Sequence, residues 1–115
     1  MINGIKIEQG YYDNSGTMTR RNGHHIPMAL KLRVFLANKY VKYSRQNKTG
    51  KVFVLNFTHG IDPENHIEAL SVCHPSDQFS RNDGLKRVIN RIHQLRVNSE
   101  NFDWKKYPWI YKLEQ

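Results

Sequence analysis

The residues best suited to chemistry in this sequence lie together in the segment CHPSDQFSRNDGLKRVINRI, residues 73–92. Several of them are basic and stand close to the expected start of a helix. Guanidinium groups form strong hydrogen bonds with phosphate, and the free amides at a helix N-terminus attract anions. The segment therefore predicts a phosphate or nucleotide site formed by Arg81, Lys86, Arg87 and Arg91, with Phe79 or an aromatic residue of the C-terminal tail to stack on a base.

The same segment also has a purely structural interpretation. Pro75 would end a strand, and Asp77 would turn the chain. Ser80, with Asp83 three residues later, resembles a capping box at a helix start. Gly84 in the first turn would let another backbone or a ligand come close. In this interpretation the arginines are ordinary surface charge, and both alternatives stay open at this point.

The pattern C-x-P-x-D-x-F-x-R-x-x-G, between a strand and an amphipathic helix, resembles that of many small proteins encoded by bacteriophages. The resemblance is limited to this segment, and its positions here are Asp77, Phe79, Arg81 and Gly84. It implies a viral or mobile-element origin. Some small phage proteins are anti-defence factors, which include sponges for cyclic nucleotide signals and inhibitors of CRISPR effectors. The resemblance does not choose between these activities.

A strong positive charge is the clearest feature of the composition. The chain has 18 lysines and arginines against 10 acidic residues, and no acidic residue occurs between Asp13 and Asp62. Such a stretch creates a positive field that attracts nucleic acids, nucleotides or acidic proteins. It predicts a second surface, for nucleic acid or a protein partner, made of Arg20, Arg21, Arg33, Lys42, Arg45 and Lys48.

Other kinds of chemistry find little support in the sequence. The six histidines and Cys73 lack the spacing of a zinc site. The only suggestion of a metal is a faint similarity of the segment NHIEALSVCH to part of an HNH-type nuclease. No nucleophile motif and no glycine-rich phosphate loop is present. We therefore expect a binding protein and not an enzyme, with no metal and no cofactor, and with its histidines scattered on a basic surface.

The elements that position these residues follow from hydrophobic periodicity. Strict alternation of apolar and other residues over 30–36 predicts a strand, and further strands are expected over 40–44, 51–57 and 66–73. Together they predict an antiparallel sheet of about four strands. Apolar residues at helical spacing from Leu85 to Leu95 predict one long C-terminal helix that begins near Ser80 and ends near Val97.

The remaining segments complete an α+β fold in a single domain, residues 1–115. Turn-forming residues are dense within 8–28, which predicts a flexible loop. The tail, residues 98–115, is rich in tryptophan, tyrosine and phenylalanine. We therefore expect it to pack on the domain or on a partner chain, such as a second copy in a homo-oligomer. The alternative is that its aromatic rings stack on bases.

These observations favour a small, basic, non-enzymatic binding protein. Its expected role is phage counter-defence through an anionic nucleotide or nucleic acid. The alternative is a protein–protein inhibitor of a host defence effector such as a CRISPR nuclease. The single cysteine and the lack of a long apolar run favour a cytoplasmic location in the host, with no membrane partner.

Overall fold

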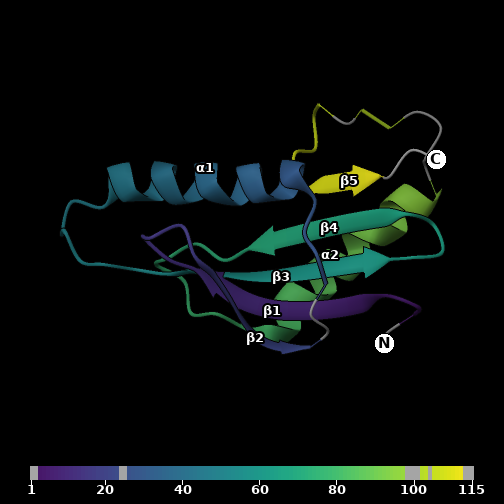
Figure 1. The fold of residues 1–115 in the computed structure, drawn as a ribbon, viewed down its shortest axis with the longest axis horizontal. Helices are drawn as coiled ribbons and strands as arrows, with labels where there is room; N and C mark the ends of the chain where they lie inside the picture. Colours follow the sequence, from purple (N-terminus) through teal and green to yellow (C-terminus); the bar gives the residue numbers. More distant parts are fainter. Residues whose placement is uncertain (1–2, 24–25, 98–101, 104, 113–115) are drawn as a thin grey trace.

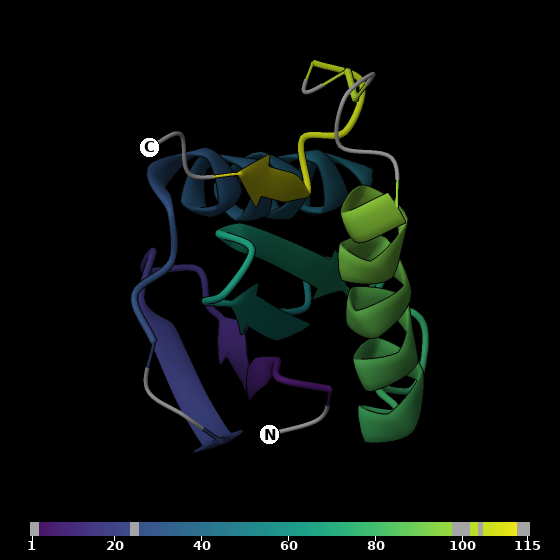
Figure 2. The ribbon, with the colours of Figure 1, turned by 90° about the vertical axis from the view of Figure 1, so that its right-hand side faces the viewer.

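The chain folds into one antiparallel sheet with a helix against each of its faces (Figures 1 and 2). The computed structural model describes residues 3–23, 26–97, 102–103 and 105–112. Within these ranges the sheet has five strands in the order β2-β1-β3-β4-β5. The elements are β1 (Lys6–Tyr12), β2 (Met18–Gly23), α1 (Leu30–Gln46), β3 (Leu55–Asp62), β4 (Ile67–Val72), α2 (Arg81–Val97) and β5 (Ile110–Lys112). The α+β class is confirmed, whereas the expected four strands and one helix are too few.

Helix α2 agrees with the prediction from its apolar stripe. Its buried residues Val88, Ile92 and Leu95 pack against one face of the sheet, in a core cluster with Ile5, Ile67, Ala69 and Ile110. The capping interaction at its start is also present, because the backbone N–H of Asp83 donates to Ser80 Oγ at 3.3 Å. Strand β4 likewise falls within the predicted strand 66–73.

Helix α1 occupies the region where two strands were predicted, so the predictions for 30–36 and 40–44 are wrong. Leu32 and Leu36 are buried against the other face of the sheet, beside Phe57 and Leu70, while Leu30 is exposed. Residues two apart lie on nearly opposite sides of a helix, because each residue turns the chain by about 100°. Apolar residues on both sides of α1 therefore produce the alternation that is typical of a strand.

Strands β1 and β2 form a hairpin inside the segment that was predicted to be a flexible loop. Its turn is held by Asp13, whose carboxylate accepts from the backbone N–H of Ser15 at 2.9 Å and of Thr17 at 3.1 Å. The turn-forming residues Asn14 to Gly16 belong to this tight connection. Strand β2 is polar because it is an edge strand, so the hydrophobic pattern gave no sign of it.

The described part of the aromatic tail packs on the domain. Phe102, Tyr107 and Trp109 lie against the core cluster of α2, and β5 pairs with β4. Lys31 of α1 ties the tail to the helix, since its Nζ donates to the carbonyl oxygen of Ile110 at 2.8 Å. Trp104, which the sequence also offered as a core or stacking residue, lies outside the described residues.

A row of buried charges crosses the sheet between β1, β3 and β4. His59 is fully buried, with Nδ1 at 2.9 Å from Glu8 Oε1 and Nε2 at 2.8 Å from Glu68 Oε2. Arg20 donates to the other oxygen of Glu8 at 2.9 Å. Burial alone would lower the pKa of His59, but the hydrogen bonds and charges of Glu68 and Glu8 outweigh it and raise that pKa. Because a carboxylate oxygen lies at each ring nitrogen, we expect both nitrogens of His59 to carry a proton. The expectation that the histidines lie on the surface is wrong for this residue.

This row predicts a pH dependence of the free energy of unfolding. Because the pKa of His59 is raised in the folded protein, its contribution is complete below the ordinary value of 6.5 and is lost as the pH rises through the raised pKa. For Glu8, burial acts to raise the pKa, but His59 and Arg20 lower it, so its contribution is lost as the pH falls below 4.5. We expect urea denaturation to give the highest stability between these values. Stability that rises steadily from pH 6.5 to pH 9 would contradict the charged state of His59.

Candidate functional site

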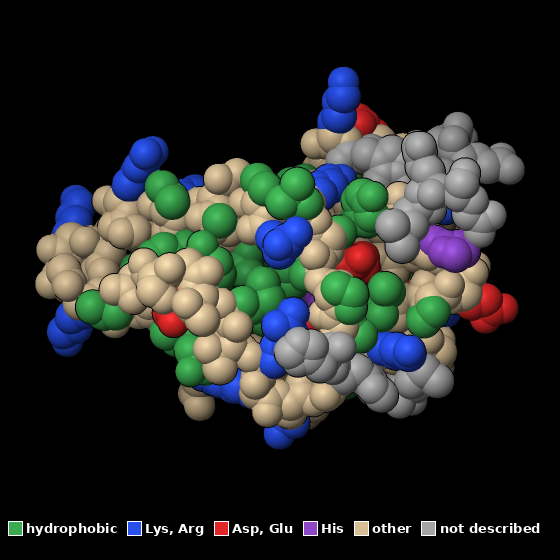
Figure 3. Space-filling view, in the orientation of Figure 1, with side chains coloured by type: hydrophobic (Ala, Val, Ile, Leu, Met, Phe, Trp, Pro, Cys, Tyr) green, Lys and Arg blue, Asp and Glu red, His purple; other side chains and the backbone are tan. Residues whose placement is uncertain are grey.

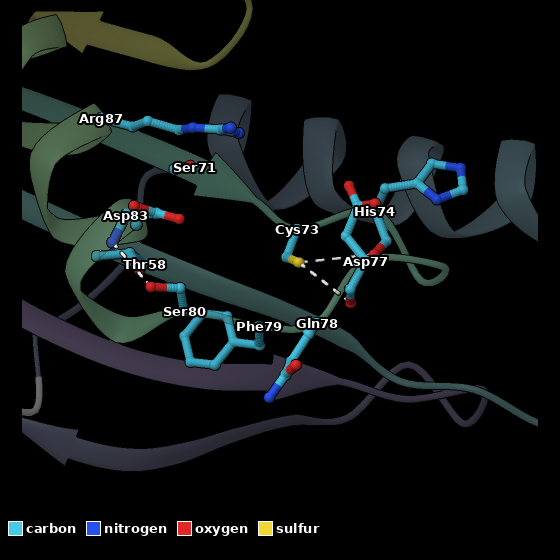
Figure 4. Close-up of a pocket in the computed structure, with 11 residues that line it drawn as sticks. Thr58, Ser71, Cys73, His74, Asp77, Gln78, Phe79, Ser80, Asp83 and Arg87 are labelled. Atoms are coloured by element: carbon cyan, nitrogen blue, oxygen red, sulfur yellow. Dashed lines mark hydrogen bonds between the residues drawn. The ribbon is translucent and has the colours of Figure 1, made fainter.

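A polar cavity of about 190 Å³ lies where α2 begins, beside β3 and β4 (Figure 4). The connector from β4 to α2, residues 73–80, forms one wall, and the first two turns of α2 form another. The lining residues are Thr58, Ser71, Cys73, His74, Asp77, Gln78, Phe79, Ser80, Asp83, Gly84 and Arg87. The cavity therefore coincides with the segment that the sequence singled out.

Two strand hydroxyls line the inner side of this cavity. Thr58 of β3 and Ser71 of β4 are register partners, so their side chains leave the same face of the sheet. Thr58 Oγ1 accepts from Gln9 Nε2 at 3.0 Å. Ser71 is only 5% exposed, and its hydroxyl has no hydrogen-bond partner among the described residues. Among the described residues the buried side-chain polar atom that lacks a partner is Asn56 Oδ1, so the Ser71 hydroxyl is not sealed from solvent. It lines the cavity, where water or a polar ligand can bond to it.

Gly84 explains how α2 comes so close to these hydroxyls. A Cβ atom added at Gly84 would fall well inside contact distance of Thr58 Oγ1. The absence of a side chain at this position thus lets the first turn of α2 lie directly on β3. The sequence predicted that a backbone or a ligand comes close to Gly84. In the structure the group that comes close is the side chain of Thr58.

The outer part of the cavity carries charges of both signs and one aromatic ring. Arg87 is exposed and makes no hydrogen bond or ion pair within the described residues. Asp77 and Asp83 line the same cavity, as does the half-buried ring of Phe79. A ligand here would meet a guanidinium, two carboxylates, hydroxyls and an aromatic face. This arrangement suits a molecule that has both hydrogen-bond donors and acceptors.

The thiol in the cavity is not an activated nucleophile. Burial raises the pKa of Cys73, the charge of Asp77 raises it further, and Arg87 opposes them only in part. The Cys73 Sγ lies 3.8 Å from the carbonyl oxygen of Asp77, a contact that helps to close the connector. The reactive species of cysteine is the thiolate, so a raised pKa leaves little of it at neutral pH.

The structure brings together only part of the predicted phosphate site. Arg87 and Phe79 line the cavity, whereas Lys86 is exposed and is not one of its lining residues. Arg81 turns toward β1, where its Nε donates to Gln9 Oε1 at 3.3 Å. The cavity therefore brings together Arg87 and Phe79 of the predicted residues, and Arg81 and Lys86 are not among its lining residues.

Arg91 has a structural position between the sheet and the tail. Its Nη1 donates to the carbonyl oxygen of Leu70, and its guanidinium lies 5.1 Å from the ring centroid of Trp109. Burial lowers the pKa of Arg91, and the neighbouring charge of Arg87 lowers it further. The guanidinium is thus engaged with the protein, and its prediction as a phosphate ligand is not supported by its contacts.

The second predicted surface is divided between β2, which is an edge strand, and α1, which packs against one face of the sheet (Figure 2). Arg20 is bound to Glu8, and the guanidinium of Arg21 lies 4.7 Å from the ring centroid of Tyr11. The other members are exposed on α1 or in the turn that follows it: Arg33, Lys42, Arg45 and Lys48. These six residues therefore do not form one continuous patch.

The sequence did not reveal Thr58 and Ser71 as site residues. Ser71 stands between Leu70 and Val72, and Thr58 stands between Phe57 and His59, where a small hydroxyl has no distinctive pattern. The one available signal was Gly84 in the first turn of α2, which indicated that something approaches the helix there.

Comparison of the chain with family models, with curated proteins and with solved structures finds no match. Within the described ranges, no three His, Cys, Asp or Glu side chains are grouped so that they could hold a metal ion. No helix in the same part of the chain is long and apolar enough to cross a membrane.

Proposed function

We propose that this protein is a non-enzymatic binding protein for a nucleotide or for a nucleotide unit of a nucleic acid, and that the cavity at the start of α2 is its site. The observation that carries this proposal is a polar cavity in which an aromatic ring, Phe79, a guanidinium, Arg87, and the Ser71 hydroxyl line the same space. In this arrangement the base stacks on Phe79, Ser71 bonds to the base or sugar, and Arg87 binds the phosphate.

The charges of the cavity favour a nucleotide over a simple anion. Inorganic phosphate in this cavity would be attracted by Arg87 but repelled by the carboxylates of Asp77 and Asp83, because like charges at short range repel. A nucleotide offers donors on its base and sugar for these carboxylates, and acceptors on its phosphate for the guanidinium. The mixed lining is thus matched by a ligand of mixed character.

The raised pKa of the Cys73 thiol, caused mainly by burial, argues against thiolate catalysis in this cavity. A protein that binds without converting its ligand would act by sequestration. This is how a counter-defence sponge for a nucleotide signal would work in the host cytoplasm, and we include that role in the proposal on the strength of the phage-like segment.

The adjacent cations Lys86 and Arg87 provide a matched test. Arg87→Ala should weaken nucleotide binding by about tenfold to a hundredfold, since a charge-assisted hydrogen bond is worth about 1.5–3 kcal/mol. Lys86→Ala removes the same charge at a position outside the cavity and should leave the affinity within about twofold. Isothermal titration calorimetry with a panel of nucleoside monophosphates and cyclic dinucleotides measures both. Equal losses in the two variants would reduce the effect to general electrostatic attraction and refute the site.

A further inference from the structure

Helix α1 has a second apolar stripe that faces away from the sheet. Leu30, Val34 and Val41 are 66%, 49% and 47% exposed. With about 100° per residue they lie within about 40° of one another around the helix axis, opposite the buried Leu32 and Leu36. A helix that serves only its own domain needs one apolar stripe. The outer stripe therefore requires an explanation beyond the fold.

Positive charge flanks this stripe and no negative charge accompanies it. Arg33 stands on one side of the stripe and Lys42 and Arg45 on the other, all of them exposed. The helix carries no aspartate or glutamate. In Figure 3, hydrophobic side chains follow one another along the upper edge of the molecule, where α1 lies, with lysine and arginine side chains around them.

A shallow hollow continues the stripe at the N-terminal end of α1. Leu30, Val34 and Phe35 form one side of it and Pro108 of the tail forms the other. Lys31 and Asn38 complete the lining. The hollow is almost wholly apolar and is large enough for a bulky side chain of another molecule. An apolar hollow beside a ridge of exposed aliphatic residues is the usual form of a protein-docking groove.

We propose that the outer face of α1 binds an acidic amphipathic segment of another protein. Apolar residues of that segment cover Leu30, Val34 and Val41, and one of them enters the hollow beside Pro108. Its carboxylates pair with Arg33, Lys42 and Arg45 at the rim. This proposal is independent of the nucleotide site, because α1 and the cavity at α2 lie against different faces of the sheet.

Charge and shape favour this occupant over the others. A second copy of this chain would bring an equally basic α1 and would be repelled. Nucleic acid would satisfy the arginines but would leave three aliphatic side chains against phosphates and sugars. An anionic membrane surface would satisfy both kinds of group, but the opposite side of α1 is fixed on the sheet, so only its narrow outer stripe could enter the lipid.

The test uses a defined probe, a fluorescent peptide with heptads of leucine on one face and glutamate on the other. Fluorescence anisotropy should show saturable binding to the wild-type protein. A scrambled peptide of the same composition should bind at least tenfold more weakly. The triple variant Leu30→Gln, Val34→Gln, Val41→Gln should lose at least tenfold in affinity for the amphipathic peptide while it keeps all its charges. Glutamine is a good helix former, so this variant is expected to fold.

The matched control replaces two exposed valines elsewhere, Val52→Gln and Val97→Gln, which are 75% and 71% exposed in the wild type. This control should bind the amphipathic peptide as the wild type does. Equal affinity for the scrambled peptide, or an unchanged affinity in the triple variant, would overturn the proposal. The proposal would also be overturned if the wild type bound phosphatidylserine vesicles or an oligonucleotide saturably, and if this binding were lost in the triple variant but kept in the control. Nucleotide affinity at the α2 cavity should be the same in all these variants.

Discussion

Replacement of His59 by leucine is expected to lower the free energy of unfolding by about 3–5 kcal/mol, the usual cost of removing one partner from a buried ion pair. The imidazolium bridges the carboxylates of Glu8 and Glu68. Neither carboxylate can reach solvent, since Glu8 is 0% and Glu68 is 5% exposed. Without His59, the donor that remains to Glu68 among the described residues is the backbone N–H of Ala29, at 3.0 Å. Two negative charges would then face each other across an apolar side chain.

The exposed His93 of α2 provides the control for this substitution. His93→Leu should change the free energy of unfolding by no more than about 0.5 kcal/mol, as is usual for surface positions. Urea denaturation of both variants at pH 6 gives the comparison. The decline in stability above pH 6.5 should also disappear in His59→Leu. A loss below about 1 kcal/mol would mean that the row of charges is not held as described.

Replacement of Gly60 by valine is the second large effect that we expect. A Cβ atom at Gly60 would fall inside contact distance of Val88 Cγ1 and at 3.1 Å from Ile7 Cδ1. Helix α2 thus rests on a glycine of β3, and a side chain there must push the helix away. Overpacking of a core typically costs about 1–3 kcal/mol, and valine adds three carbon atoms at the tightest contact, so we expect the upper end of that range or more.

The same substitution should also affect the nucleotide site. Arg87 directly precedes Val88, so a shift of α2 moves the guanidinium relative to Ser71. The double variant Gly60→Ala, Val88→Ala adds one methyl group to the strand and removes both γ-methyl groups of Val88 from the helix, including the one that clashes, and should be more stable than Gly60→Ala alone. Denaturation and nucleotide titration of these variants test both points. Full stability and affinity in Gly60→Val would contradict the packing of α2 on β3.

The sequence predicted the second half of the fold better than the first. Helix α2 has one apolar stripe and a cap at Ser80, so its periodicity has a single interpretation. Helix α1 has two opposite stripes, and over 30–36 they produce the alternation of a strand. The β1–β2 hairpin was missed because β2 is an exposed edge strand, so its alternating residues carry no apolar signal.

The cavity at the start of α2 lies in the segment where the sequence predicted a site, but only two of the five predicted residues line it. Phe79 and Arg87 belong to it, whereas Arg81 and Arg91 bind other parts of the protein. Spacing along a helix predicts which side chains share a face, but it does not reveal what the neighbouring strands offer to them. The carbonyl oxygen of Leu70 and the ring of Trp109 engage Arg91, and only the sheet order brings them there.

The most direct test of the nucleotide site is a calorimetric comparison of three ligand classes on the wild-type protein and on Arg87→Ala. The classes are the nucleotide panel, the corresponding nucleosides and inorganic phosphate. The proposal predicts that at least one nucleotide binds at least tenfold more tightly than its nucleoside and than phosphate, and that Arg87→Ala removes the advantage over the nucleoside. Saturable binding of no nucleotide, or a nucleotide affinity equal to that of phosphate alone, would contradict it.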